Sequence, residues 1–438
     1  MKYNLYILLS ALLTIISGCK YKGEEQTSSP AEQSTYQPTP PQYTAKRDLT
    51  KPTETINVES TISTSTDICL SEVASSIEYY QVGDDKYPVT EVVAVDGGFI
   101  ALNMPKLYLY RQGMKRKRVG LKTQYIDWRY GIGVEEKNNL FYDKVTTRLY
   151  VQLKKLDRET GYSDKFIVEL PPLDSVLARR YYLYADSLPK RHLSRDWKTL
   201  FTPEMYICRF NFPGTGYDQG INTFNAQNDT LCHLPIGLDS IPPRKDDNFY
   251  NFTQYNTFYL YGNQPTFFVT YCDTIYRLLD HQTIAPVYNI HLGKYRALAN
   301  YVINKGDKRN KAWVTDLQES PKGVFLKVHR EGKSNKSGWL DNKDKENRDF
   351  PSEDYLMVYL KNKRQTKALP LTNQGITNDL DDGLPFWPDG QTDEYMYMIR
   401  SAKDLKQQVK LTGSPKQNTL KNFLSDLPDN QNVMIVVK

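Results

Sequence analysis

The sequence is poor in the residues and patterns that mark the common enzyme classes. Its 438 residues include only five histidines and five cysteines. No cysteines are spaced C-x-x-C and no histidines form H-E-x-x-H or H-x-H, so the usual redox and zinc signatures are excluded. The nucleophile elbow G-x-S-x-G is also missing. With 51 acidic residues, no catalytic pair of carboxylates can be singled out from sequence.

Long apolar runs are absent except at the N-terminus. Leu5–Ile16 is apolar and follows the positive charge of Lys2. It is too short to cross a bilayer, which needs roughly 20 apolar residues. A charged start, a short apolar core and small residues before a cleavage site are typical of a secretory signal peptide. We therefore predict a signal peptide over residues 1–18.

The segment Ile16-Ser17-Gly18-Cys19 resembles the lipobox of bacterial lipoproteins. The resemblance implies that Cys19 receives a diacylglycerol and a further acyl chain such as palmitate, and two chains anchor a protein stably. The alternative is an ordinary cleaved signal beside a chance cysteine. We expect a lipid-anchored protein of the cell envelope, at the outer membrane, with the periplasmic and surface faces both open. Nucleic acid is not expected as a partner of an exported chain.

Residues 19–60 are dominated by Ser, Thr, Gln, Pro and Glu and show no apolar periodicity. Such a segment cannot bury enough surface to offset its ordering entropy, so it is predicted to be a flexible linker. Residues 61–438 contain no second linker and are predicted to form one large domain. The other four cysteines, Cys69, Cys208, Cys232 and Cys272, permit disulfides in an exported chain, but sequence cannot give their pairing.

Strand patterns dominate this domain. Short runs rich in Tyr, Val, Ile, Phe and Thr are bounded by Gly, Asn, Asp and Pro, which is typical of antiparallel strands. Helical periodicity is confined to Pro172–Arg180, Ala402–Val409 and Thr419–Ser425. The predicted strands are Glu91–Val95, Gly98–Asn103, Lys106–Tyr110, Leu149–Leu153, Lys165–Leu170, Glu204–Asn211, Thr257–Tyr261, Thr266–Tyr271, Thr274–Leu278, Val287–Leu292, Gly323–Arg330, Tyr355–Lys361 and Tyr395–Ile399.

One strand–turn–strand pattern recurs along the chain. Its fullest form is "CDTIYRLLDHQTIAPVYNIHLG" at 272–293, and weaker forms lie at 106–120 and 228–237. Hairpins of this kind cannot bury both faces alone, but stacking them around an axis can. At roughly 60 residues per four-stranded unit, the domain predicts an all-β propeller of about six four-stranded blades.

Four segments resemble the six-bladed β-propeller lipoproteins of Bacteroidetes, a largely uncharacterised family. They are "DICLSEVASSIEYYQV" (67–82), the hairpin at 273–293, "GITNDLDDGLPFWPDG" (375–390) and the C-terminal "LPDNQNVMIVVK" (427–438). The resemblance implies a propeller over residues 67–438 that ends in a C-terminal strand. This chain departs from the family pattern at Asp382, where a glycine is usual, so it is an outlying member.

The densest group of oxygen ligands is Asn378, Asp379, Asp381 and Asp382. Such oxygens suit Ca²⁺, but the spacing is not that of an EF-hand, and a turn held by Asx hydrogen bonds is the competing interpretation. Nearby Trp387 is a candidate binding aromatic or a packing residue. His291 alternates with apolar residues in a strand and is a candidate channel residue. No resident cofactor or metal is predicted.

The function expected from these features is that of a non-catalytic binding or scaffold lipoprotein for a glycan, a peptide or a membrane-protein partner. The alternative is an envelope hydrolase, lyase or lactonase with its site at the mouth of the propeller channel. The channel separates the two hypotheses. Converging histidines and carboxylates would favour an enzyme, whereas aromatic and polar side chains would favour a binding module.

Overall fold

The structure is a computed structural model of the chain. It describes residues 40–84, 89–103, 106–111, 116–122, 140–156, 163–178, 183–184, 187–193, 199–209, 220–235, 257–269, 272–297, 310–332 and 352–438. The predicted signal peptide and Cys19 lie outside these residues. Within them, no helix combines the length and the apolarity that a membrane crossing requires.

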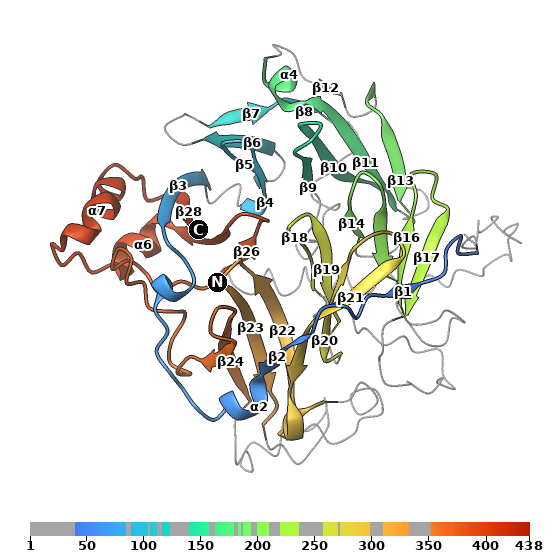
Figure 1. Cartoon of the computed structure of the whole chain (residues 1–438). Coiled ribbons are helices and arrows are strands. Elements are labelled where there is room, and N and C mark those ends of the chain that lie inside the picture. Colours follow the sequence, from blue (N-terminus) through green and yellow to red (C-terminus); the bar gives the residue numbers. More distant parts are fainter. Residues whose placement is uncertain are drawn as a thin grey trace, which may run out of the picture. The chain divides into compact units, whose positions relative to one another are not determined.

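Small sheets follow one another around a common centre and form a β-propeller (Figure 1). The first three sheets comprise β4 (Val89–Val95), β5 (Gly98–Asn103), β6 (Lys106–Arg111) and β7 (Lys117–Val119); β9 (Leu140–Asp143), β10 (Arg148–Leu156), β11 (Ser163–Pro172) and β13 (Lys190–Leu193); and β14 (Thr199–Phe201), β15 (Tyr206–Arg209), β16 (Gly220–Phe224) and β17 (Thr230–Pro235). A two-stranded parallel pair, β8 (Leu121–Lys122) and β12 (Leu183–Tyr184), lies beside them.

The remaining sheets comprise β18 (Thr257–Tyr261), β19 (Gln264–Phe268), β20 (Thr274–Leu278) and β21 (Thr283–His291); β22 (Ala312–Glu319), β23 (Gly323–Arg330), β24 (Glu353–Leu360) and β25 (Gln365–Ala368); and β26 (Gly390–Gln391), β27 (Met396–Ser401), β28 (Gln431–Val437) and β3 (Ile77–Asp84). The last sheet closes the ring, because β3 from the start of the domain pairs with the C-terminal strand β28. This confirms the predicted C-terminal strand.

The expected count of about six four-stranded blades needs correction. Five sheets of the described chain are four-stranded and antiparallel, whereas the sheet of β18–β21 has six strands and is mixed. Its extra strands, β1 (Lys46–Arg47) and β2 (Glu54–Asn57), pair in parallel with β21. The propeller class itself is confirmed.

The predicted hairpin at 272–293 is confirmed as β20 and β21. Asp280 makes its turn: its carboxylate accepts the backbone N–H groups of Gln282 and Thr283, both at 2.8 Å. Ile275 and Leu278 on β20 are buried in two different cores, so both faces of this strand are packed. The Asp280 contacts form an Asx turn, in which a side chain bonds nearby backbone N–H groups and the next strand begins directly after it.

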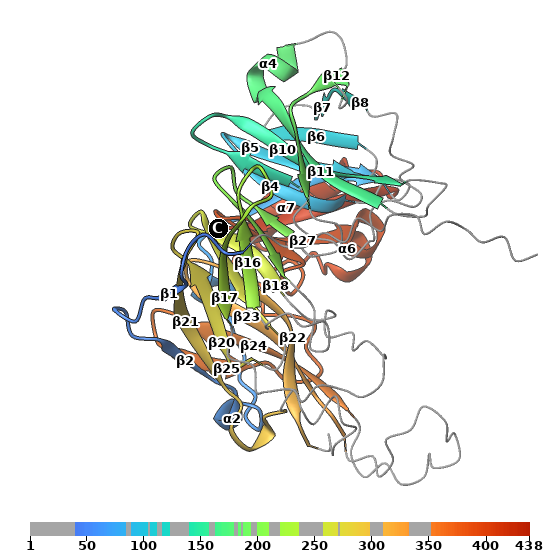
Figure 2. The same cartoon turned by 90° about the vertical axis from the view of Figure 1, so that its right-hand side faces the viewer.

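Residues 42–70 form a segment that we call the N-terminal belt, which runs along the outer edges of successive sheets. The N–H of Tyr43 donates to the carbonyl of Leu231 in β17 at 2.8 Å. β1 and β2 then follow β21, and Figure 2 shows them on the outer side of that sheet. Further on, the N–H of Thr66 donates to Ala368 of β25, and the N–H of Leu70 donates to Thr377.

The belt shows that the predicted flexible linker is wrong for residues 42–60. Two features of the fold are not visible in the composition of this segment. The outer strands offer unpaired backbone groups to which a segment of any sequence can hydrogen-bond, and Ile56 and Val58 are completely buried. Helix α2 (Val58–Thr61) follows, with the side chain of Asn57 capping the N–H of Ser60 at 3.1 Å.

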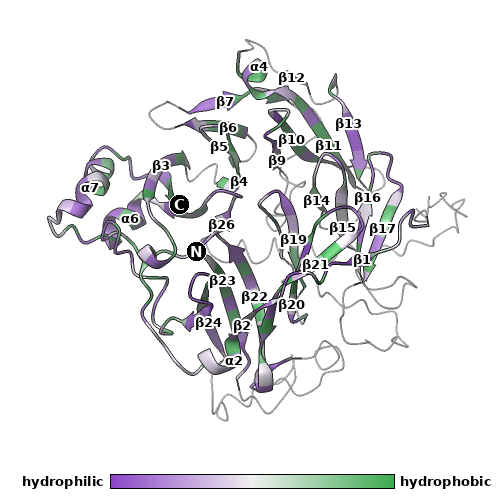
Figure 3. Cartoon of the chain, viewed as in Figure 1, coloured by the Kyte–Doolittle hydropathy of each residue, from purple (hydrophilic) through white to green (hydrophobic). Residues whose placement is uncertain are grey.

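The cores lie between neighbouring sheets. One core joins the first and last sheets through residues such as Phe99, Tyr110 and Met434, with the two rings stacked at 4.9 Å. Figure 3 shows hydrophobic colour along the strands, while α7 (Asn418–Ser425) is mainly hydrophilic. Helices α4 (Leu173–Ala178), α6 (Ala402–Gln408) and α7 confirm the three predicted helical segments.

Candidate functional site

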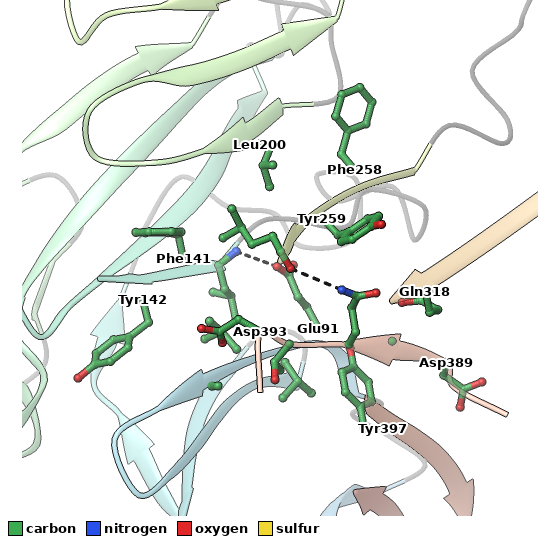
Figure 4. A pocket seen from close by; sticks show the side chains of 18 of the residues that line it. Glu91, Phe141, Tyr142, Leu200, Phe258, Tyr259, Gln318, Asp389, Asp393 and Tyr397 are labelled. Atoms are coloured by element: carbon green, nitrogen blue, oxygen red, sulfur yellow. Dashed lines mark hydrogen bonds between the residues drawn. The ribbon is translucent and has the colours of Figure 1, made fainter. Parts of the chain in front are cut away.

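The candidate site is a cavity of about 210 Å³, which Figure 4 shows from close by. Besides Tyr397 and Ile399 of β27, its lining comes mainly from the first strands of six sheets: β4, β9, β14, β18, β22 and β26. These are the strands nearest the axis of a propeller, so the cavity lies in the central channel. A larger open groove of about 680 Å³, lined by residues such as Arg330, Glu331 and Tyr355, lies beside the sheet of β22–β25.

Aromatic side chains form much of the cavity wall. Phe141 comes from β9, Phe201 from β14, Phe258 and Tyr259 from β18, and Tyr397 from β27. The rings of Phe141 and Phe201 meet edge to face at 5.8 Å. Four sheets therefore contribute aromatic rings to the wall, and these rings, which favour strand conformation, give the cavity its apolar faces.

Glu91 is the central polar group of the cavity. It lies on β4, is 9% exposed, and points into the space between the surrounding strands (Figure 4). The backbone N–H of Leu140 on β9 donates to its Oε1 at 2.9 Å. On the opposite wall, Nε2 of Gln391 donates to the carbonyl of Leu260 at 3.5 Å. Gln318 also lines the cavity.

Other charged groups of the lining are paired at its margin. The Lys144 ammonium contacts Asp393 at 2.8 Å and Glu394 at 2.7 Å. Asp389 accepts the N–H of Ile399 at 2.7 Å and pairs with Arg400 at 2.9 Å. These contacts fix the ends of β9, β26 and β27 around the opening.

Tyr397 stays protonated at neutral pH. Burial raises the pKa of its phenol, and the carboxylates of Glu91 and Asp389 raise that pKa further. A neutral phenol is a hydrogen-bond donor and acceptor and presents a ring face with negative charge density. Tyr397 therefore adds an aromatic surface close to two carboxylates.

A buried charge network, which we call the Glu319 network, supports one cavity wall. The Glu319 carboxylate is fully buried; Arg277 and Lys361 each donate to it at 2.7 Å. The phenols of Tyr259 and Tyr288 also donate to it, at 2.8 and 3.0 Å. Burial and the nearby Glu319 carboxylate raise the pKa of the Tyr259 phenol well above its usual value.

The Glu319 network also contacts residues that line the cavity. Tyr259 lines the cavity, and the backbone N–H of Glu319 donates to Oε1 of Gln391, another lining residue. The network therefore holds side chains from β18 and β26 in place, and it joins three neighbouring sheets.

The acidic cluster predicted from sequence forms a structural clasp instead of lining the cavity. The Asn378 amide donates to Asp381 at 2.7 Å, and the phenol of Tyr79 donates to the same carboxylate at 2.6 Å. Asp379 accepts the N–H and hydroxyl of Ser71 at 2.9 and 2.6 Å. Asp382 has a φ of 54°, a left-handed conformation that explains why a glycine suits this position.

Two sequence motifs therefore meet in this clasp: the Leu-Ser-Glu phrase of the short 3₁₀ helix η1 (Leu70–Glu72) and the segment 375–390. Within the described chain, no group of three or more His, Cys, Asp or Glu residues could hold a metal ion. The cavity lining contains none of the predicted residues Asn378, Asp379, Asp381 and Asp382. Their binding role remains a prediction.

Trp387 and His291 also lie away from the cavity lining. Trp387 is 4% exposed and packs edge to face on Phe325 at 5.5 Å. His291, half exposed, contacts Glu59 of α2 at 3.2 Å.

Sequence patterns missed Glu91, Tyr259 and Gln391 as a group because they are about 130 to 300 positions apart. Only their place on the first strand of a repeated unit could have linked them.

The thiols of Cys69 and Cys232 form no disulfide, although an exported chain would permit one. The strand containing Cys208 is β15.

Together the fold and the cavity define a β-propeller with a lined central channel. The chain matches, over residues 38–411, the family model described as a domain of unknown function (DUF4933), and it belongs to that family. This places it in an uncharacterised family, as the sequence resemblance implied, without showing the six-bladed lipoprotein family specifically. No curated protein matches it.

Three solved structures are similar at low identity. A member of the DUF4221 family from Bacteroides vulgatus shares 10% identity at a TM-score of 0.37, covering 84% of this chain and 97% of that one. A complex of BT0996 with RGII shares 11% identity at a TM-score of 0.23, covering 70% and 90%. A glycoside hydrolase shares 11% identity at 0.23, covering 70% and 91%. Similarity this distant carries no argument about function.

Proposed function

We propose that this protein is a lipid-anchored module of the cell envelope that binds a glycan unit or a peptide side chain in its central cavity. The observation that carries the proposal is the lining, which combines aromatic faces with carboxylates and amides and draws on six of the sheets. Small-ligand sites are typically concave and largely apolar, with a few placed polar groups that fix orientation. No histidine is among the described lining residues, which favours binding over acid–base catalysis by histidine.

A hydrolase remains the second candidate because Glu91, Asp389 and Asp393 line the same cavity. Glycoside hydrolysis uses two carboxylates roughly 5–9.5 Å apart, one as an acid and one as a base or nucleophile. The two functions differ in one readout. A binding module leaves a bound oligosaccharide intact, whereas a hydrolase releases new reducing ends.

Narrowing the mouth of the cavity should weaken binding without unfolding the protein. Thr90 is exposed and lines the cavity, so Thr90→Trp adds a large ring at the rim. We expect its dissociation constant for any glycan or peptide that shifts the wild-type melting temperature to rise about tenfold or more. The full chain would be screened in detergent by thermal shift, and each shift would be followed by calorimetry.

Val145→Trp is the matched control, because Val145 is 92% exposed in the β9–β10 turn and is not a lining residue. It should bind like the wild type. Equal loss in both variants, or no loss in either, would place the binding site outside the cavity and contradict the proposal.

The proposed anchor is tested separately. Cys19→Ala removes the thiol that would carry the lipid, and each buried methylene contributes about 0.8 kcal/mol to membrane binding. We expect the variant to move from the membrane fraction to the soluble fraction of the envelope and to lose labelling by radioactive palmitate. Cys69→Ala should remain labelled and membrane-bound. Palmitate labelling of the Cys19→Ala protein would refute anchoring at this residue.

A further inference from the structure

We infer that the central cavity takes an aromatic side chain of a peptide in preference to a glycan unit. This inference rests on the proposed function, because it names the class of ligand that the same cavity would take. Three observations carry it: the rings that line the cavity, the protein partners that polar lining groups already have, and the size of the cavity.

Phe141 offers a ring surface to a ligand. It lies on β9, lines the cavity and is only partly buried. Its ring meets that of Phe201 edge to face at 5.8 Å and that of Tyr150 at 6.0 Å between the ring centroids. Aromatic rings pack in such groups at centroid distances of about 4.5–7 Å. A ligand ring that enters the cavity can therefore extend an aromatic cluster that already exists.

Tyr259 adds a second ring from another sheet. Figure 4 shows Phe141 and Tyr259 on different sides of Glu91. The phenol of Tyr259 donates to Glu319 at 2.8 Å, and Glu319 is not among the described lining residues. Tyr259 therefore meets a ligand with its ring, while its hydroxyl proton is held by the buried Glu319 network.

Uncharged polar groups of the lining already have partners in the protein. Gln391 accepts the backbone N–H of Glu319 with its Oε1 and donates to the carbonyl of Leu260 at 3.5 Å with its Nε2. The hydroxyl of Thr392 donates to the carbonyl of Tyr395 at 3.3 Å and accepts its N–H at 3.1 Å. A ligand hydroxyl that is buried without a partner costs binding free energy. A sugar would therefore compete with these bonds, whereas an aromatic ring requires none of them to break.

Charged groups of the lining are held in the same way. The backbone N–H of Leu140 donates to Glu91 at 2.9 Å, and the Lys144 ammonium contacts Asp393 at 2.8 Å and Glu394 at 2.7 Å. An uncharged side chain can enter without displacing any of these contacts. The edge of an aromatic ring is positive, so an aromatic group also suits a position beside the Glu91 carboxylate.

The size of the cavity fits one side chain. Its volume of about 210 Å³ lies below the roughly 300–1,000 Å³ of sites that enclose a drug-sized ligand. A single phenyl group can enter such a space while the peptide backbone remains at the opening. An oligosaccharide would place only one of its units inside.

The test compares probes that differ in the aromatic ring. Acetyl-Gly-Phe-Gly-amide is paired with acetyl-Gly-Ala-Gly-amide, and methyl β-glucoside represents a glycan unit. Binding of each to the full chain in lipid nanodiscs, where no detergent competes for an apolar site, would be measured by calorimetry and saturation-transfer NMR. We expect the Phe peptide to bind about tenfold or more tightly than either other probe, because its side chain is buried. The strongest saturation transfer should reach its ring protons.

Phe141→Leu keeps an apolar side chain but removes the ring. It should reduce the preference for the Phe peptide over the Ala peptide about threefold or more, the loss expected for one aromatic pair. Tyr43→Leu is the matched control, because Tyr43 is 44% exposed on the N-terminal belt and is not among the described lining residues. This variant should keep the preference. An undiminished preference in Phe141→Leu would overturn the inference.

The outcomes separate the inference from the proposed function. Equal binding of the two peptides, or tighter binding of the glucoside than of the Phe peptide, would overturn the preference for an aromatic side chain. If Thr90→Trp abolished that binding, cavity binding itself would stand. No binding of these probes, or of any ligand in the thermal-shift screen, by protein shown to be folded by circular dichroism would contradict both.

Discussion

Glu319→Ala should lower the free energy of unfolding by about 3–5 kcal/mol, the range for breaking a buried ion pair by removing one partner. The carboxylate is fully buried and receives bonds from Arg277, Lys361 and the phenols of Tyr259 and Tyr288. Without it, two largely shielded cations and two phenols lose the acceptor that they share. Urea denaturation followed by tryptophan fluorescence measures the loss.

The control is Glu54→Ala, which removes a carboxylate that accepts a phenol hydrogen bond from Tyr359 at 2.7 Å. We expect a loss of about 1 kcal/mol there, the usual net value of one hydrogen bond. A further variant replaces Glu319 by Leu and both Arg277 and Lys361 by Met. If unpaired charge causes the loss, this triple variant should regain much of the stability. Equal losses for Glu319→Ala and Glu54→Ala would contradict this account.

Glu72→Gln should destabilise the protein at pH 7 by about 1–2 kcal/mol, and the difference from wild type should fade in acid. Burial raises the pKa of the Glu72 carboxyl, but hydrogen bonds from Lys363 and Lys367 outweigh burial and lower that pKa from 4.5 to about 2. A lowered pKa of this size corresponds to at most ~3 kcal/mol of stability. Solvent screening around the half-exposed Lys363, and the bond that the Gln oxygen can still accept, reduce the expected loss.

The direction of the pH effect follows from the lowered pKa. The stability contributed by Glu72 is fully present above pH 4.5 and is lost as the pH falls toward about 2. Unfolding would be measured at about pH 7, 4 and 2.5 for both proteins, which spans this window. Asp429→Asn, which removes the 71% exposed partner of Lys406, should leave the acid midpoint unchanged. A Glu72→Gln effect of equal size at all three pH values would refute the assignment.

Much of the fold was predictable because local rules and tertiary packing agree here. Each of the thirteen predicted strands overlaps an observed one, and four match in full: Gly98–Asn103, Thr257–Tyr261, Thr274–Leu278 and Gly323–Arg330. These strands begin and end at turn residues such as Asp280, whose side chain satisfies nearby backbone donors. Short strands without such boundaries were missed, for example Gly390–Gln391, whose conformation depends on pairing with β27.

The candidate site was much less predictable. Glu91 lies in a predicted strand, but nothing in that strand says which face meets the channel. Asn378, Asp379 and Asp381 were conspicuous as oxygen ligands, yet their partners are Tyr79, Ser71 and one another. Proximity in sequence reflects local turns, whereas the cavity is built mainly from the first strands of six sheets, so most of its residues share a position in the repeat instead of a motif.

The belt was mispredicted for a different reason. Composition measures whether a segment can build its own core. Residues 42–60 instead hydrogen-bond to the edges of sheets that the rest of the domain forms, and Ile56 is buried there. A polar segment can therefore be ordered when a folded domain supplies its hydrogen-bond partners.

The most direct test of cavity binding is a crystal structure of the full chain with the tightest ligand from the screen. The account predicts ligand density inside the central cavity, in contact with Glu91, Tyr259 and Gln391. Density in the open groove beside Arg330 and Tyr355, with the central cavity empty of ligand, would contradict it.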